Sequence, residues 1–288
     1  MNVARRPEEL EPARRAVAIG TFDGVHVGHV RVLEAALAAP LRPAAVTFDP
    51  HPRTALGNHV ELLTTLERRL ELLEELGFAD VLVVRFDAEL AALSPEEFAE
   101  SVLRAAGAEV IAAGEGFRFG RGRSVDLELL ERLGFDVRRV PLVENASSSH
   151  IRALLEAGEV EKAAQVLGRP AEVEGTVVAG DGRGVGLGFP TANLAVPPGV
   201  LVPALGVYAG AARGHRAAIS IGTNPHYGGT ERRVEAHLLD FDGDLYGERV
   251  VVELWERLRG EAAFASEREL VDAIADDVRR TRAAARPS

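Results

Sequence analysis

In the first 167 residues, short apolar runs alternate with segments whose apolar residues recur every three or four positions. The runs predict strands, and the segments between them predict helices. This alternation predicts an α/β domain with a parallel sheet and right-handed crossovers, in which ligands bind beyond the carboxyl ends of the strands. The predicted strands are Ala16–Phe22, Ala44–Phe48, Val81–Phe86, Val110–Ala113 and Val137–Val140. The predicted helices are Val30–Ala39, Thr65–Leu76, Pro95–Ala106, Val125–Leu133, Ser148–Ala157 and Val160–Leu167.

From Glu172 onward the pattern changes to short β-rich runs that are separated by glycine and proline. Such runs predict an antiparallel barrel or sandwich, here followed by a terminal helix at Ser266–Ala284. Gly168–Pro170 interrupt the pattern between the two halves, and a length of 288 residues suits two domains. We therefore predict domains at residues 1–170 and 171–288.

The composition favours small-molecule partners. The 44 acidic residues outnumber the 33 basic residues and give a net charge of −11, which argues against a nucleic-acid surface. The chain has no cysteine, which excludes thiolate catalysis and fits a reducing cytoplasm. No uncharged apolar run approaches the length of about 18 residues that a membrane helix needs, so no membrane partner is expected. Lys162 is the sole lysine, which argues against Schiff-base chemistry and a Walker-type phosphate loop.

The segment Gly20–His29, GTFDGVHVGH, joins the first predicted strand to the first predicted helix. The amides and positive dipole of a helix N-terminus attract anions, and Gly24 and Gly28 carry no side chain that blocks close approach. His26 and His29 are placed to donate hydrogen bonds to the charge that builds on a leaving pyrophosphate. Alternatively, the two histidines share a helix face or bind a metal, but no further ligand is spaced nearby to complete a zinc set.

This segment resembles the GxFDGxHxGH motif of the nucleotidyltransferase module in bacterial bifunctional riboflavin kinase/FMN adenylyltransferases, also called FAD synthetases. Ser147–Arg152, SSSHIR, resembles the family's SSTxxR segment, whose hydroxyls and arginine hold ATP phosphates. Without the resemblance, serines before a helix are interpreted as N-caps. Capping and phosphate binding use the same backbone N–H groups, so the two interpretations are compatible. The ATP-binding residues that the resemblance implies are Gly20, Phe22, Asp23, Gly24, His26, Gly28, His29, Ser148, Ser149 and Arg152, with His26 and His29 catalytic.

Two further segments of the first half match the family. Thr47–Pro52, TFDPHP, and Gly114–Gly120, GEGFRFG, each follow a predicted strand. The resemblance implies flavin-binding roles for Asp49, His51 and Phe117, although a rigid strand exit explains TFDPHP equally well. Gly116 stands where the family usually has Asn or Asp, which puts adenylyl transfer in doubt. Val27 replaces a residue that is often basic.

In the second half, Gly180–Leu194 resembles the riboflavin kinase core GxxRGxxLGFPTANL. Thr191 and Asn193 lie two residues apart and so on one side of an extended chain, where their neutral oxygens suit Mg²⁺. PTAN alone would be a turn before an edge strand, but the fifteen-residue match favours the kinase. The implied ATP and Mg²⁺ residues are Gly182, Gly188, Pro190, Thr191 and Asn193, of which Thr191 and Asn193 bind the metal.

Arg232–Phe241 resembles the family's VEVHLLDF segment and places Glu235 at the position of its catalytic carboxylate. A carboxylate within hydrogen-bond reach accepts the proton that a primary alcohol loses as it attacks the γ-phosphate. In isolation, Glu235 would be a solvated residue on a strand. His226 and Tyr227 stand where the family commonly has Thr and Phe.

The motifs occur in family order from about Ala16 to about Arg282. The resemblance therefore implies a cytoplasmic, Mg²⁺-dependent enzyme with a Rossmann-like nucleotidyltransferase domain and a β-barrel riboflavin kinase domain. Its substrates and products would be riboflavin, FMN, FAD and ATP. Two alternatives stay open at this point: a riboflavin kinase with an inactive adenylyltransferase domain, and a non-catalytic flavin-binding protein. The sequence leaves the oligomeric state open.

Overall fold

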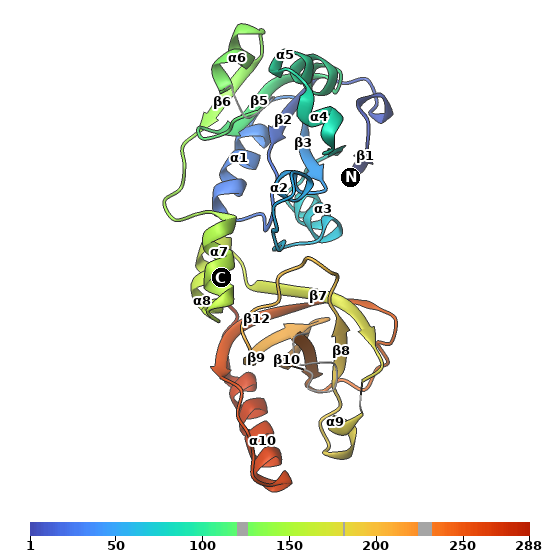
Figure 1. Cartoon of the computed structure of the whole chain (residues 1–288), viewed down its shortest axis with the longest axis vertical. Helices are drawn as coiled ribbons and strands as arrows, with labels where there is room; N and C mark the ends of the chain where they lie inside the picture. Colours follow the sequence, from blue (N-terminus) through green and yellow to red (C-terminus); the bar gives the residue numbers. More distant parts are fainter. Residues whose placement is uncertain (120–125, 181, 224–231) are drawn as a thin grey trace. The chain divides into compact units, whose positions relative to one another are not determined.

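The computed structural model describes residues 1–119, 126–180, 182–223 and 232–288 (Figure 1). Within these residues the chain divides into two compact units, Met1–Ala146 and Ser147–Ser288. The first unit contains a parallel sheet, and the second contains a closed barrel. No helix among the described residues has the length and apolar character needed to cross a membrane.

The first unit has six described strands in the order β1-β4-β3-β2-β5-β6, and every neighbouring pair is parallel. This confirms the predicted parallel sheet. The strand β1 was not predicted, because three residues are too short to show a periodic pattern. The strands are β1 (Asn2–Ala4), β2 (Arg15–Ile19), β3 (Arg42–Asp49), β4 (Asp80–Arg85), β5 (Ala108–Gly114) and β6 (Asp136–Val140).

The longer helices of this unit lie where periodicity predicts them, within a few residues. The predicted helix Pro95–Ala106 is continuous in space but changes from an α-helical turn, α5, to a π-helical segment, η2. The short helices α2 and α4 were missed, because four or five residues carry no readable period. The helices are η1 (Pro7–Glu9, a 3₁₀ turn), α1 (Val27–Leu37), α2 (Pro52–Ala55), α3 (Leu66–Glu75), α4 (Ala88–Ala92), α5 (Pro95–Phe98), η2 (Ala99–Arg104) and α6 (Leu127–Arg132).

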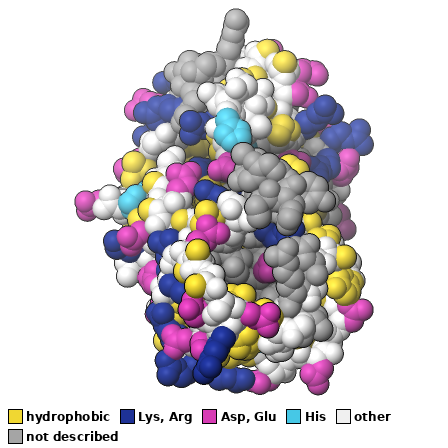
Figure 2. Space-filling model, turned by 60° about the horizontal axis from the view of Figure 1, so that its bottom comes forward, with side chains coloured by type: hydrophobic (Ala, Val, Ile, Leu, Met, Phe, Trp, Pro, Cys, Tyr) yellow, Lys and Arg dark blue, Asp and Glu magenta, His cyan; other side chains and the backbone are white. Residues whose placement is uncertain are grey.

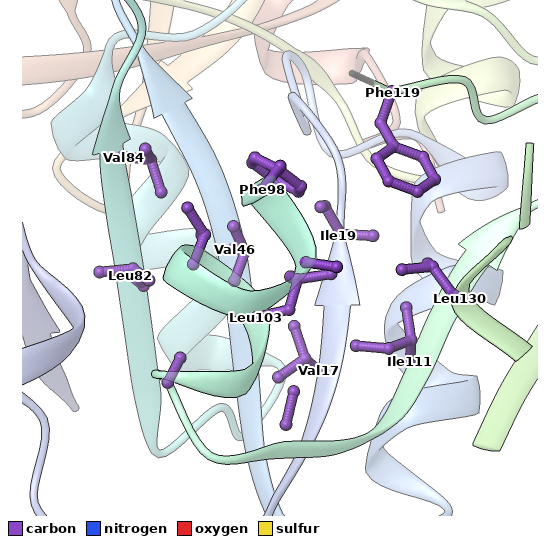
Figure 3. Packing of buried hydrophobic residues seen from close by; sticks show 14 of the residues in the cluster. Val17, Ile19, Val46, Leu82, Val84, Phe98, Leu103, Ile111, Phe119 and Leu130 are labelled. Atoms are coloured by element: carbon purple, nitrogen blue, oxygen red, sulfur yellow. The ribbon is translucent and has the colours of Figure 1, made fainter. Parts of the chain in front are cut away.

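Both faces of the sheet are covered, because successive side chains of a strand point to opposite faces. On β2, Val17 and Ile19 belong to a hydrophobic cluster with Phe98 and Leu103, which Figure 3 shows from close by. The intervening residues Ala16 and Ala18 belong to a second cluster with residues of α1 and α3. Burial on both sides explains why the strands read as continuous apolar runs.

The second unit is a closed barrel in the order β10-β11-β8-β7-β12-β9, with every neighbouring pair antiparallel. Of the predicted alternatives, barrel and sandwich, the barrel is therefore correct. The strands are β7 (Ala171–Val178), β8 (Ala192–Ala195), β9 (Gly206–Ala212), β10 (His215–Thr223), β11 (Arg232–Leu238) and β12 (Arg249–Arg259). The helices are α7 (Ser148–Glu156), α8 (Val160–Leu167), α9 (Arg183–Gly186) and α10 (Glu267–Ala283).

The helices α7 and α8 belong to the same compact unit as the barrel. The amide of Arg257 in β12 donates to Glu161 of α8 at 3.1 Å, and the amide of Ala204 donates to the carbonyl of Leu155 in α7 at 3.0 Å. The contacts therefore divide the chain near residue 146, whereas the sequence pattern divides it near 170. The domain boundary at residue 170 stays a prediction.

Candidate active sites

Three of the predicted motifs lie side by side at one edge of the parallel sheet. The strand β2 pairs with β3 on one side and with β5 on the other. These strands end at Ile19, Asp49 and Gly114, and in a parallel sheet such ends share one edge. The GTFDG, TFDPHP and GEGF segments are thus brought together, as predicted.

The turn after β2 has an unusual backbone. Phe22, Gly24 and Val25 have positive φ angles of 49°, 82° and 38°. A positive φ is rare for a β-branched residue such as Val25, and each such residue costs of the order of 1–3 kcal/mol. Strain of this kind persists only where the surroundings hold it, and it concentrates at functional sites. Nothing in the residue types of this turn predicts it.

Asp23 supplies part of that support. Its side chain is fully buried, and Oδ1 accepts hydrogen bonds from the amides of Leu63 and Thr64 at 2.9 and 3.2 Å. The amide of Gly24 donates to the Thr64 hydroxyl at 3.2 Å. A Cβ atom on Gly24 would lie 2.7 Å from Leu63 Cδ1. Asp23 and Gly24 therefore fix the turn against the loop before α3, and their predicted contact with ATP stays a prediction.

His26 is the N-cap of α1. Its Nδ1 atom accepts hydrogen bonds from the amides of Gly28 and His29 at 3.1 and 3.3 Å, and the ring is 5 % exposed. The His26 ring thus caps these two amides, and the predicted contact of the first turn with phosphate stays a prediction. A Cβ atom on Gly28 would lie 3.1 Å from the His26 ring, so glycine leaves room for the capping ring.

The rings of His26 and His29 are stacked, with centroids 3.6 Å apart and planes inclined by 18°. The ring of Phe22 meets His29 edge-on at 5.4 Å. Imidazole lone pairs lie in the ring plane, so stacked rings do not aim at one ion between them. The described residues contain no group of three His, Cys, Asp or Glu side chains placed to hold a metal. The phosphate-binding role of the pair stays a prediction.

Arg69 on α3 places a buried cation beneath the same sheet edge, which the residue pattern does not predict. The residue is 2 % exposed, and its Nη1 atom donates to the Thr47 hydroxyl at 3.3 Å and the Phe48 carbonyl at 3.2 Å. Burial lowers the pKa of Arg69, against the attraction of Asp23 and Asp49. A guanidinium nevertheless stays protonated in proteins, so positive charge is fixed near the predicted phosphate site. An arginine in a charged helix is normally expected on the solvated face.

Asp49 is the last residue of β3, and His51 follows two residues later. Asp49 is half-buried and pairs with Arg5 at 3.4 Å. His51 caps α2, because its Nδ1 accepts a hydrogen bond from the amide of Arg53 at 3.2 Å. These contacts support the rigid strand exit, and the flavin-binding roles of both residues stay predictions.

Gly116 and Phe117 follow β5. The Phe117 ring stacks on Phe119 of the hydrophobic core, with centroids 5.9 Å apart. Gly116 does not have a positive φ, and among the described residues a Cβ atom there would meet only Leu142, at 3.8 Å. Leu142 itself is 74 % exposed. A larger side chain at residue 116 therefore fits without backbone strain.

The predicted phosphate-binding residues Ser148, Ser149 and Arg152 begin α7 in the second unit. The N-cap is the preceding Ser147, whose hydroxyl accepts a hydrogen bond from the amide of His150 at 3.2 Å. Since these residues belong to the other unit, their grouping with His26 and His29 stays a prediction.

In the second unit, Asn193 of β8 lies directly opposite Glu235 of β11. Leu194, Val234 and Ala236 are buried, so the alternating residues Asn193 and Glu235 share the outer face of the barrel. Directly opposite residues have Cβ atoms about 5 Å apart. The strand pairing thus brings the predicted base beside a predicted metal ligand, although 42 positions separate them in the chain.

Arg233 is a further charged residue of this site that the sequence analysis missed. Its Nη1 atom lies 3.5 Å from Glu235 Oε1, and both side chains are about one-third exposed. Residues two apart on a strand share a face, so the spacing of Arg233 and Glu235 in the RRVE segment already indicates that the two side chains lie together.

The glycine-rich loop leaves space for the predicted metal ligands. A Cβ atom on Gly180 would lie 2.2 Å from Asn193 Nδ2, and one on Gly184 would lie 2.3 Å from the Phe189 carbonyl and 3.4 Å from Thr191 Oγ1. Glycine is therefore required at Gly180 for Asn193 to keep its position. The neutral oxygens of Thr191 and Asn193 are donors that Mg²⁺ accepts, so the residues fit this metal.

Gly182 and Gly188 have a different reason to be glycine. Their φ angles are 69° and 85°, and a Cβ atom on either would meet no described atom within 4 Å. They supply backbone conformation, and their contact with ATP stays a prediction. Gly120, His226 and Tyr227 lie outside the described residues.

Two family models match the chain. The model described as FAD synthetase matches residues 8–152, and the model described as riboflavin kinase matches residues 167–285. Together they leave residues 1–7, 153–166 and 286–288 unmatched.

Curated relatives match over nearly the full length. A bifunctional riboflavin kinase/FMN adenylyltransferase of Listeria monocytogenes is 35 % identical and covers 96 % of this chain and 94 % of its own. The Escherichia coli K12 protein of the same name is 35 % identical, and the match covers 96 % of this chain and 93 % of that protein. A solved structure titled macrolide-efflux protein from Streptococcus pneumoniae is 31 % identical and has a TM-score of 0.87. The match covers 97 % of this chain and 98 % of that one.

Proposed function

The chain belongs to the family of bifunctional riboflavin kinase/FMN adenylyltransferases, and from this premise we propose how its residues perform the two reactions. It is a transferase that phosphorylates riboflavin to FMN and adenylylates FMN to FAD. This reading is favoured over a riboflavin kinase with a weakened or inactive adenylyltransferase domain, since both family models match and the curated relatives carry both activities in their name. The roles of single residues, the metal and the cellular location are proposals.

We assign the kinase reaction to the outer face of the barrel around Asn193 and Glu235, and their direct cross-strand pairing carries this assignment. Glu235 accepts the proton of the ribityl 5′-hydroxyl as its oxygen attacks the γ-phosphorus of ATP, and ADP leaves. Thr191 and Asn193 hold Mg²⁺, which neutralises phosphate charge when bound. Arg233 restricts the Glu235 carboxylate from the same strand.

We assign adenylyl transfer to the carboxyl edge of the parallel sheet. An FMN phosphate oxygen attacks the α-phosphorus of ATP, and pyrophosphate leaves. The phosphate is already ionised near neutral pH, so positioning and charge neutralisation suffice without a general base. His29 and the Nε2 side of His26 donate to the pyrophosphate, and buried Arg69 adds positive charge. The predicted role of Ser148, Ser149 and Arg152 in holding ATP phosphates stays a proposal from the family resemblance alone.

The experiment that tests the function is an incubation of purified protein with Mg–ATP and either riboflavin or FMN, followed by chromatography. We expect FMN and FAD from riboflavin, and FAD from FMN. Formation of FMN alone would support the kinase-only alternative. Formation of neither product would support the non-catalytic flavin-binding protein.

We propose that the enzyme acts in the cytoplasm, where ATP is available for both reactions. The described part of the surface in Figure 2 carries basic and acidic side chains interspersed with each other. A net charge of −11 likewise suits small-molecule partners better than nucleic acid.

Gly116→Asn is expected to raise the rate of FAD formation from FMN by about tenfold, the value of one hydrogen bond restored in the transition state. The backbone at Gly116 has no positive φ, and the neighbouring Leu142 is exposed, so Asn fits. Gly116→Ala is the matched control, because it adds the Cβ atom without the amide. Equal rates for the Asn and Ala variants would show that this side chain does not limit adenylyl transfer.

Gly180→Ala is expected to lower FMN formation by roughly 10²-fold, the scale for a displacement of about 1 Å at a reacting site. The new methyl group would overlap Asn193, whereas a Cβ atom on Gly186, where φ is not positive, would meet no atom of the described residues within 4 Å. Gly186→Ala is therefore the control. If both variants turn over riboflavin equally well at matched folding, the position of Asn193 does not matter to the kinase reaction.

A further inference from the structure

We propose that His237 is a positioning residue of the kinase reaction, which holds the peptide that carries Thr191 against the strand that carries Glu235. The inference rests on the proposed kinase function of the barrel. His237 was not among the predicted site residues. It is half-buried and lies two residues after Glu235 on β11, so both side chains are on the outer face of the barrel.

The His237 ring binds the segment before β8 in two ways. Its Nδ1 atom lies 2.7 Å from the carbonyl oxygen of Pro190. A carbonyl can only accept a hydrogen bond, so Nδ1 carries the proton. The ring also meets Phe189 edge-on, with centroids 5.6 Å apart and planes at 84°.

The Pro190 carbonyl belongs to the same rigid peptide plane as the amide of Thr191. A fixed direction of this carbonyl therefore limits the directions in which the Thr191 side chain can leave the backbone. Asn193 is fixed separately, because it pairs with Glu235 across β8 and β11 and with Val178 of β7. Thr191 lies before the start of β8 and lacks a strand partner among the described pairings. The hydrogen bond from His237 thus links the peptide of Thr191, a proposed metal ligand, to β11, the strand that carries the proposed base Glu235.

The test compares three substitutions in the full-length chain. His237→Phe keeps a ring but removes the donor, His237→Asn places an amide nitrogen where Nδ1 lies, and His237→Gln places it near Nε2. We expect His237→Phe to raise the KM for Mg–ATP in FMN formation by about five- to tenfold, the scale for one neutral hydrogen bond. The kcat should change little, because in this proposal Thr191 binds Mg–ATP equally in the ground state and in the transition state. His237→Asn should restore most of the affinity, and His237→Gln should not.

His215 offers a matched control in the same barrel. Its Nδ1 atom lies 3.3 Å from the Leu239 carbonyl, and its ring meets Phe241 edge-on at 5.1 Å. It has the same kinds of contact but lies outside the segment 189–193. His215→Phe should leave the KM for Mg–ATP unchanged, and His237→Phe should leave the conversion of supplied FMN to FAD unchanged.

Two readouts do not depend on turnover. Calorimetric titration with Mg–ADP, the product of the kinase reaction alone, should show the same loss in His237→Phe and the same rescue in His237→Asn. In ligand-free protein, nitrogen NMR of the ring should show the Nδ1–H tautomer, and the Thr191 amide resonance should move in His237→Phe and return in His237→Asn.

An unchanged KM and Mg–ADP affinity in His237→Phe would overturn the inference, and so would equal behaviour of the Asn and Gln variants. A wild-type protein that makes no FMN would instead refute the proposed kinase function. In that case the Thr191 resonance still decides whether His237 positions this peptide.

Discussion

Glu235→Gln is expected to lower the rate of FMN formation from riboflavin by about 10²–10⁴-fold, the range for loss of a general base. The amide keeps the shape of the side chain and its place opposite Asn193 but cannot take the proton of the attacking hydroxyl. Riboflavin binding should stay close to that of the wild type. The measurements are steady-state FMN formation by chromatography and riboflavin binding by fluorescence.

Glu256→Gln provides the matched control. Glu256 is a half-exposed glutamate on β12 that lies 3.7 Å from Arg280, much as Glu235 lies 3.5 Å from Arg233. It is outside the strands β8 and β11 that form the proposed site, so its loss should not change turnover. Supplied FMN should still be converted to FAD by Glu235→Gln, because that reaction is assigned to the other unit. A Glu235→Gln enzyme that turns over at nearly the wild-type rate would remove this carboxylate from the mechanism.

The architecture was largely predictable because it depends on periodic patterns. Strands buried on both faces appear as apolar runs, and the β-rich second half indicated a barrel or sandwich. The choice between those two required the pairing of β9 with both β10 and β12, which no local pattern encodes. β1 was missed because its three residues show no period, and it is a strand only through its pairing with β4.

The sequence motifs predicted which residues form the candidate sites but not how those residues are positioned relative to one another. The motifs named Asn193 and Glu235, whereas their contact depends on the register of β8 against β11. The capping by His26 and the positive φ of Val25 depend on the shape of one turn and on the support from Asp23. Arg69 could not be found, because helix periodicity alone does not indicate that an arginine is buried beneath a strand end.

His29→Ala is expected to lower FAD formation from FMN by roughly 10²–10³-fold, the scale for removing one donor to developing charge. His29 is half-buried and stacks on His26, but its ring does not cap the helix, so its loss should leave α1 intact. FMN formation from riboflavin should be unchanged. The measurement is single-turnover FAD formation under saturating Mg–ATP, with circular dichroism as the check on folding.

Substitutions of His26 distinguish its role as the N-cap of α1 from its proposed role as a hydrogen-bond donor to pyrophosphate. His26→Ala removes the acceptor for two amides and should cost about 1 kcal/mol of stability, whereas His26→Asn keeps a good N-cap oxygen and removes the ring. If the rings act on the pyrophosphate, His26→Asn will fold like the wild type and still lose FAD synthesis, as His29→Ala does. If His26→Asn retains full FAD synthesis, the ring of His26 serves the helix alone, and the charge on pyrophosphate must be met by other donors such as His29 and Arg69. If His29→Ala also retains full activity, the histidine pair has no part in adenylyl transfer.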